Sequence, residues 1–125
     1  MIVGTGLDLV SVERIRGFHA RRGARGLARL FTDAEVAYCL GQTDPAPSLA
    51  ARFAAKEAFF KAVGLGWGTG GDWREIEVRR GSRGEPSLDL RGRAAEAAGA
   101  RGARAIHVSL THTGEVAGAV VVLEG

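Results

Sequence analysis

The chain has 125 residues, the size of one domain, because two cores of half this length would each bury too little surface. Its 46% hydrophobic and 25% charged residues are typical of globular domains and exclude a disordered or fibrous protein. The longest apolar run, from Val116 to Leu123, has 8 residues, whereas a membrane helix needs about 20. We therefore expect one domain over residues 1–125 and no membrane partner.

The N-terminus and the cysteine content bear on location. No basic segment of a secretory signal precedes the first apolar stretch, and Asp8 interrupts that stretch. The single cysteine, Cys39, can form neither an internal disulfide nor a multi-cysteine zinc site, and we interpret it as structural. Together these features predict a cytoplasmic protein.

The net charge of +3 hides an uneven distribution of basic residues. Of the 17 basic residues only Lys56 and Lys61 are lysines, and six arginines lie between Glu13 and Asp33 with no acid among them. Such a segment indicates an anionic partner: a nucleic acid, an acidic protein or a phosphorylated ligand. A solvated helix face shows the same pattern, so composition leaves both interpretations open.

Secondary-structure signals place strands at both ends of the chain and helices between them. The expected elements are a strand over residues 2–10, a basic helix capped by Ser11, a short helix through about Leu40, a helix from Ser48 to about Val63, strands over 75–80 and 87–90, a helix over 91–100, and strands over 105–112 and 115–124. We expect an α+β fold in which a mostly antiparallel sheet packs on the long central helix.

Glycines mark the breaks in this pattern. Gly4 and Gly6 indicate a close backbone approach or a bulge in the first strand, and Gly23 and Gly26 interrupt the basic helix. Residues 66–71 match G-x-G-x-x-G, but they follow a helix and precede a strand. A dinucleotide site needs the reverse order, so we interpret this stretch as a loop.

Asp8 lies within an apolar strand, where a carboxylate is costly to bury unless it is paired or bound to a metal. Strand alternation places it on the face that carries Gly4 and Gly6, which predicts open space around the carboxylate. A buried ion pair and a metal site both fit this pattern.

The central helix carries the densest chemistry. Arg52 and Lys56 are i,i+4 neighbours, as are Glu57 and Lys61, so both pairs can converge on one ligand, although an exposed Glu–Lys pair is usually only a weak stabiliser. Because the chain uses Arg almost everywhere else, its two lysines indicate a need for a compact, titratable ammonium.

The strand over residues 105–112 alternates between an apolar and a polar face. His107, Ser109 and Thr111 share the polar face, which suits phosphate or ribose contacts and equally suits solvent. His112 has no local partner, and we interpret it as structural.

Four stretches resemble the holo-acyl-carrier-protein synthases, the small bacterial 4'-phosphopantetheinyl transferases. They are GTGLDLVSVERI (4–15), LFTDAEVAYC (30–39), ARFAAKEAFFKAVG (51–64) and HVSLTHTGEVAGAVVVLEG (107–125). They occur in the order of the family, and the run R-F-A-A-K-E-A-x-x-K-A-x-G at 52–64 is their most specific part.

The resemblance implies a 4'-phosphopantetheinyl transferase fold and a cytoplasmic transferase of fatty acid biosynthesis. Such an enzyme moves 4'-phosphopantetheine from coenzyme A to a serine of apo-acyl carrier protein and releases adenosine 3',5'-bisphosphate (3',5'-ADP). By resemblance, Asp8 and Glu57 hold Mg²⁺ and Lys61 stabilises or protonates the departing phosphate. The base for the serine proton stays open between a carboxylate and a metal-bound water.

Further roles follow from the same resemblance. The expected coenzyme A ligands are Arg52, Lys56, Lys61, His107, Ser109 and Thr111. The basic helix places a stripe of residues on one face, namely Arg14, Phe18, Arg21, Arg22 and Arg25, which would bind the acidic helix of the carrier protein. The family is trimeric with active sites between subunits, so we expect a homotrimer.

The alternative is a non-catalytic, Arg-rich module that binds nucleic acid. It explains the basic helix, but it explains neither Asp8 nor the cluster of Lys56, Glu57 and Lys61 on another helix. The 6% of aromatic residues also leaves few side chains for base stacking. We therefore expect no nucleic-acid partner.

Overall fold

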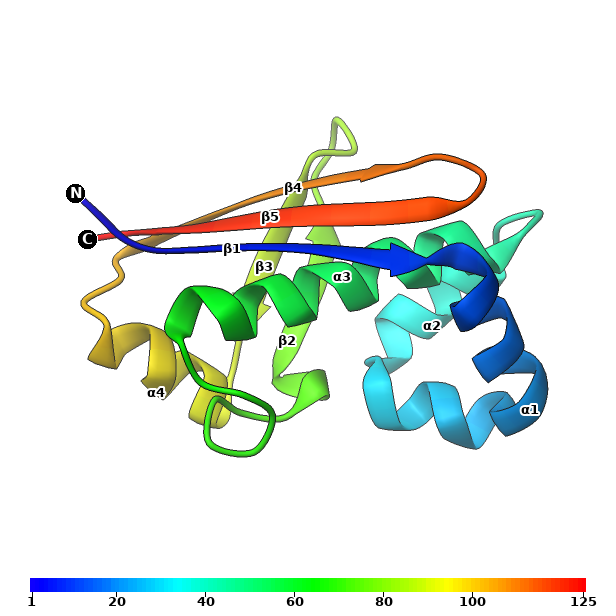
Figure 1. Ribbon diagram of the computed structural model, residues 1–125, viewed down its shortest axis with the longest axis horizontal. Coiled ribbons are helices and arrows are strands. Elements are labelled where there is room, and N and C mark those ends of the chain that lie inside the picture. Colours follow the sequence, from blue (N-terminus) through cyan, green and yellow to red (C-terminus); the bar gives the residue numbers. More distant parts are fainter.

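The helix α3 (Pro45–Val63) runs through the middle of the molecule, along one face of an antiparallel sheet (Figure 1). The computed structural model describes residues 1–125. The sheet consists of β1 (Ile2–Ser11), β5 (Val116–Glu124) and β4 (Ala105–His112), with β5 in the centre. The two termini lie side by side, and the Met1 amino group donates to the carbonyl oxygen of Gly125 at 2.8 Å (Figure 1).

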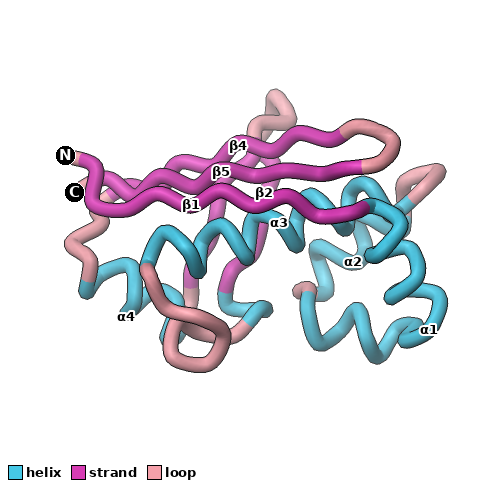
Figure 2. The backbone as a smooth tube through the Cα atoms, in the orientation of Figure 1, coloured by secondary structure: helices cyan, strands magenta, loops and turns pink.

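The remaining elements pack around α3, the helices on the side away from this sheet and a two-stranded hairpin beside β4 (Figure 2). They are α1 (Val12–Leu30), α2 (Asp33–Leu40), the 3₁₀ helix η1 (Trp73–Glu75), the hairpin β2 (Ile76–Arg80) and β3 (Pro86–Leu90), and α4 (Gly92–Ala100). The buried apolar side chains form one cluster, and α3 contributes many of its members. The expected α+β class is confirmed. No helix has the length and apolar character that crossing a membrane requires.

The sheet rests directly on the helix backbone because two glycines of β1 have no side chain. A Cβ atom on Gly6 would lie 1.8 Å from the carbonyl oxygen of Ala58, and one on Gly4 would lie 2.2 Å from that of Ala62. The register between β1 and β5 also shifts between Ile2 and Gly4. The predicted close approach and the predicted bulge are therefore both present.

Two helices differ from the expectation. The helix α3 begins at Pro45 instead of Ser48, because the Asp44 carboxylate accepts from the backbone N–H of Ala46 at 3.2 Å and proline fits the first helical turn. The helix α1 continues to Leu30 through a kink at Gly23, which has φ 61° and ψ −152°. This left-handed φ is open to glycine, so the chain turns there and resumes as helix.

Candidate active site

Three of the predicted residues meet where β1 crosses the second half of α3. The Lys61 Nζ donates to the Asp8 carboxylate at 3.0 Å and to the carbonyl oxygen of Leu7 at 2.9 Å. The Asp8 side chain is 18% exposed and the Lys61 side chain 55% exposed, so the pair is open to a ligand from one side. The prediction of open space beside Asp8 on the side of Gly6 is wrong, because the backbone of α3 fills that space.

Glu57 lies beside this pair, one helical turn before Lys61. Partial burial raises the pKa of its carboxyl group, and the negative charge of Asp8 raises it further, while Lys61 and Arg14 act in the opposite direction. The two carboxylates are therefore close enough to repel each other. The contribution of Arg14 shows that the start of α1 borders the same site.

This pair of carboxylates fits Mg²⁺. A hard cation of this kind binds one or two carboxylates and completes its shell with water and substrate phosphate oxygens. Asp8 and Glu57 supply two carboxylates, and they come from separate rigid elements. No larger group of His, Cys, Asp or Glu side chains is gathered anywhere in the chain, so the other ligands would be water or substrate.

Lys56 does not belong to this site, and the expectation that it contacts coenzyme A is wrong. Its side chain is fully buried on the face of α3 opposite to Ala58. The Nζ donates to Glu35 Oε1 at 2.8 Å, to the carbonyl oxygen of Trp73 at 3.0 Å and to that of Ile76. All three N–H groups are thus used inside the protein, and none is free for a phosphate.

Arg52 lines a second site, a pocket of about 450 Å³ between α2, α3 and the ends of β2 and β4. Its guanidinium lies 4.4 Å from the centre of the Tyr38 ring and donates to Ser48 Oγ at 2.9 Å. The Arg80 guanidinium lies 5.1 Å from the same ring, and His112 is also on the wall. The buried Nε of Arg52 has no partner in the chain. Two cations around one ring make this pocket suited to an anion.

Sequence reasoning gave no function to Tyr38, Arg80 or His112. The one usable signal was strand alternation, which places His112 on the apolar face of β4 with Leu110, toward the core helix. A polar imidazole at the end of an apolar face is a reason to look for a pocket. Tyr38 and Arg80 carry no such signal, because their place in the pocket depends on tertiary structure.

The polar face of β4 points away from the carboxylates. Asp8 lies opposite Ala119 on the neighbouring strand, and Ala119 lies opposite Leu110 on the next, so these three side chains face α3. Ser109 lies on the opposite face of the sheet. His107 and Thr111 share the outer face with Ser109, and the His107 Nε2 lies 2.9 Å from a carboxylate oxygen of Glu124. Within one chain these residues therefore do not meet Asp8 and Glu57.

The predicted partner-binding stripe follows α1 only as far as its kink. The expectation of one continuous face is wrong, because the turn at Gly23 places Arg25 on a second helical segment. Phe18 is half-buried, and its ring lies against Gly26, where a Cβ atom would be 3.1 Å from the ring edge. Arg14, Arg21 and Arg22 remain exposed on the first segment.

Known proteins share this fold and this chain length. A family model described as the 4'-phosphopantetheinyl transferase superfamily matches residues 4–119. The holo-[acyl-carrier-protein] synthase of Syntrophus aciditrophicus is 45% identical over 100% of this chain and 98% of its own length. That of Anaeromyxobacter dehalogenans strain 2CP-C is 51% identical over 100% of this chain and 98% of its own length.

Solved structures agree. The holo-[acyl-carrier-protein] synthase of Neisseria meningitidis superposes with a TM-score of 0.90 at 31% identity, and each chain is covered to 100%. The Bacillus anthracis enzyme, solved in complex with CoA (3',5'-ADP), superposes with a TM-score of 0.82 at 35% identity, over 99% of this chain and 97% of its own. The chain therefore belongs to the 4'-phosphopantetheinyl transferase superfamily, in the group of the holo-[acyl-carrier-protein] synthases.

Proposed function

We propose that this protein transfers 4'-phosphopantetheine from coenzyme A to a serine of apo-acyl carrier protein and releases 3',5'-ADP. The observation that carries the proposal is the meeting of Asp8, Glu57 and Lys61 in a chain of this superfamily. The relatives named above are holo-[acyl-carrier-protein] synthases, and one of them was solved in complex with CoA (3',5'-ADP).

The reaction forms a bond between the serine oxygen and the phosphorus next to pantetheine. The anhydride bond from that phosphorus breaks, and its oxygen leaves with 3',5'-ADP, so negative charge develops on the leaving group. The Lys61 ammonium, which is half-exposed beside Asp8, stabilises that charge or donates a proton to it. Mg²⁺ held by Asp8 and Glu57 would supply further positive charge to the pyrophosphate oxygens.

The pocket around Tyr38 would take a phosphate of coenzyme A that does not react. Arg52 and Arg80 supply guanidinium groups and His112 an imidazole, and these groups bind phosphate through charge-assisted hydrogen bonds. The buried Nε of Arg52, which has no partner in the chain, is a donor for such a ligand. Arg52 is therefore proposed as a coenzyme A ligand, the role expected for it from the sequence.

The test of the proposed function is to incubate the protein with coenzyme A, Mg²⁺ and apo-acyl carrier protein and then to weigh the carrier. We expect the carrier to gain one 4'-phosphopantetheine group and 3',5'-ADP to appear in equal amount. A carrier of unchanged mass, with several apo-carrier proteins tried, would contradict the proposal. Retention of the protein on RNA or DNA without transfer would favour the nucleic-acid module instead.

The exposed arginines of α1 are proposed to bind the carrier. Arg14→Ala and Arg21→Glu should raise the KM for the carrier by about tenfold and leave the KM for coenzyme A nearly unchanged, because rim charges act mainly on association. The defect should shrink in high salt, which screens the wild-type attraction. Steady-state kinetics at two salt concentrations checks this, and equal losses for both substrates would contradict it.

The outer face of the sheet is proposed to join three copies of the chain. It exposes apolar side chains of β1 and β5, with Leu7 63% and Leu9 69% exposed, together with Val116 and Val120. Burial of such a patch between subunits stabilises an assembly. It would also bring His107, Ser109 and Thr111 to a neighbouring subunit, where they could complete its coenzyme A site.

Light scattering should therefore give three times the mass of one chain. Leu9→Glu places a charge in the shared face and should convert the trimer to a monomer with little activity. Leu40→Glu changes another exposed leucine, on α2 and 47% exposed, and should leave the mass unchanged. A wild-type monomer that is fully active at the concentration of the assay would contradict the trimer.

A further inference from the structure

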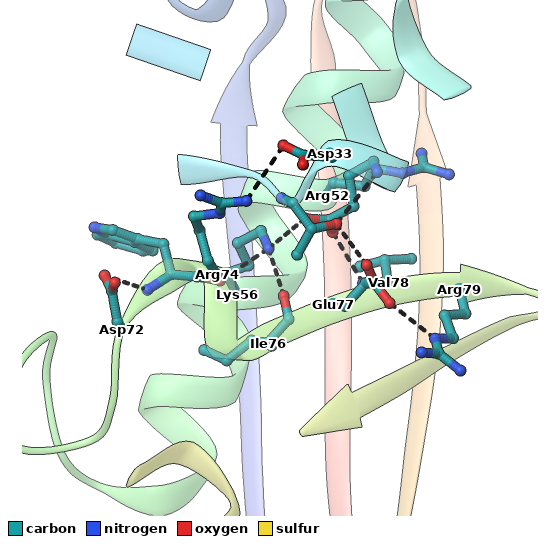
Figure 3. Close-up of polar contacts among 12 residues, drawn as sticks. Asp33, Arg52, Lys56, Asp72, Arg74, Ile76, Glu77, Val78 and Arg79 are labelled. Atoms are coloured by element: carbon teal, nitrogen blue, oxygen red, sulfur yellow. Dashed lines mark hydrogen bonds and ion pairs between the residues drawn. The ribbon is translucent and has the colours of Figure 1, made fainter. Parts of the chain in front are cut away.

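A fully buried ion pair joins three elements behind the pocket of Tyr38. Lys56 on α3 donates to Glu35 on α2 at 2.8 Å, and both side chains are 0% exposed. The Lys56 ammonium also donates to the carbonyl oxygens of Trp73 and Ile76, where β2 begins (Figure 3). The other Glu35 oxygen accepts from the backbone N–H of Val78 at 2.9 Å. The pair is thus fully satisfied, and its bonds reach α2, α3 and β2.

Each of these elements continues from the pair directly into the pocket. Tyr38 follows Glu35 by three residues on α2, and Arg52 precedes Lys56 by one turn on α3, so in both cases the residues share a helix face. Arg80 follows Val78 by two residues on β2 and therefore points to the same side of the strand. The pair therefore holds α2 and α3 about one helical turn from Tyr38 and Arg52, and it holds β2 two residues from Arg80.

The residues on the pocket wall depend on this arrangement. The Tyr38 ring touches both guanidinium groups, at 4.4 Å from the Arg52 carbon and 5.1 Å from the Arg80 carbon. The three side chains come from three different elements, so a small shift of any one element separates ring and cation. Figure 3 shows Lys56 projecting from α3 toward Ile76 at the start of β2, and Arg52 comes from the same helix.

We propose that the buried pair of Lys56 and Glu35 is a positioning device for the anion pocket, because it locks α2, α3 and β2 in the register that stacks Arg52 and Arg80 on Tyr38. This rests on the proposed function, in which the pocket binds a phosphate of coenzyme A. Neither Lys56 nor Glu35 touches the ligand. Their effect passes through Tyr38, Arg52 and Arg80.

A buried ion pair is suited to such a role. Two apolar side chains of similar size could fill the same volume, often with equal stability, but they would tolerate sliding of one element past another. Directed bonds from Lys56 to Glu35 and two carbonyl oxygens are made only in one register. The pair therefore matters for the geometry of the pocket more than for the stability of the fold.

The test compares ligand binding and stability in a neutral double variant. Lys56→Met together with Glu35→Gln removes both charges, so no unpaired charge stays buried, and the Gln amide can still accept from one backbone N–H and donate to a carbonyl oxygen. We expect it to unfold within a few degrees of the wild-type temperature, but to bind 3',5'-ADP about tenfold more weakly by calorimetry, since small misplacements of binding groups are costly. The KM for coenzyme A should rise more than kcat falls.

Arg74→Ala is the matched control. It removes an ion pair that also reaches α2, between Arg74 on η1 and Asp33, but this pair is exposed and lies outside the pocket. Its affinity for 3',5'-ADP should equal that of the wild type. A folded double variant that binds 3',5'-ADP as tightly as the wild type would overturn the proposal.

Tyr38 keeps the proposal testable if the double variant does not fold. Tyr38 is at the surface, so Tyr38→Leu should fold, and it should weaken 3',5'-ADP binding about tenfold. Tyr38→Phe keeps the ring and should recover most of the affinity that Tyr38→Leu loses. Normal binding by Tyr38→Leu would overturn the proposal as well. A wild-type protein that neither binds 3',5'-ADP nor modifies a carrier would instead overturn the proposed function.

Discussion

Glu57→Gln is expected to abolish transfer, with kcat/KM at least about 100-fold below the wild type, while the protein remains folded. The amide keeps the size of the side chain but lacks the charge that a divalent cation needs. Asp8→Asn should have the same effect from the other side of the site. The measurement is transfer after EDTA treatment, as a function of added Mg²⁺.

The same variant should stabilise the metal-free protein. In the folded chain the pKa of Glu57 is raised by partial burial and by Asp8. The contribution of this one group to folding is therefore most favourable at low pH, where Glu57 is protonated, and is lost as the pH rises through the raised pKa. At neutral pH the ionised group therefore costs stability, and Gln removes that cost. The gain should be no more than about 1 kcal/mol, because water screens the partly exposed carboxyl.

Two comparisons decide this prediction. Mg²⁺ should raise the unfolding temperature of the wild type but not that of Glu57→Gln, because binding to the folded state alone stabilises it. Glu13→Gln, an exposed acid at the start of α1, should behave like the wild type in both assays. Wild-type transfer without any divalent metal, or normal transfer by Glu57→Gln at every Mg²⁺ concentration, would contradict the two-carboxylate site.

The elements and the carboxylate site could be predicted because their signals are local or carried by a motif. The alternation of β4 and the capping box of Thr32 and Glu35 are visible within a few residues, and the structure contains both. The pairing of Asp8 with the helix residues Glu57 and Lys61 came from the resemblance. Local pattern alone left Asp8 open between an ion pair and a metal site.

The burial of Lys56 could not be predicted from local sequence patterns. On a helix, residues 56 and 57 point about 100° apart, so Glu57 can face β1 while its neighbour faces the core. The partner that neutralises Lys56 is Glu35, which lies 21 residues away and whose spacing from Thr32 indicates only a helix cap. Only the packing of α2 on α3 shows that one residue serves both purposes.

The anion pocket was missed for a related reason. Its walls come from α2, α3, β2 and β4, and the distances in sequence between Tyr38, Arg80 and His112 carry no signal. Arginine is also the commonest charged residue of the chain, so Arg80 does not stand out. The pocket is a property of the tertiary fold.

The geometry of the active site depends on the packing contact between β1 and α3. Asp8 follows Gly6 by two residues on the same face of β1, and Glu57 precedes Ala58 by one residue on α3. The distance between the two carboxylates is therefore set where Gly6 meets the carbonyl oxygen of Ala58. A wider spacing at this point would separate the carboxylates and also move Lys61 away from Asp8.

Gly6→Ala should accordingly have the largest effect of any single methyl group added to this protein. The new Cβ would lie 1.8 Å from the carbonyl oxygen of Ala58 and 2.9 Å from the backbone nitrogen of Ala62, and backbone atoms cannot rotate away as a side chain does. We expect a loss of about 3 kcal/mol in unfolding free energy and loss of transfer even below the new unfolding temperature. Gly99→Ala on α4, where a Cβ meets nothing within 4 Å, should instead stabilise the helix by about 0.5–1 kcal/mol and retain full activity. Denaturant unfolding and the carrier assay on both variants check this, and a Gly6→Ala protein with wild-type stability and activity would show that β1 and α3 tolerate a wider spacing than the structure implies.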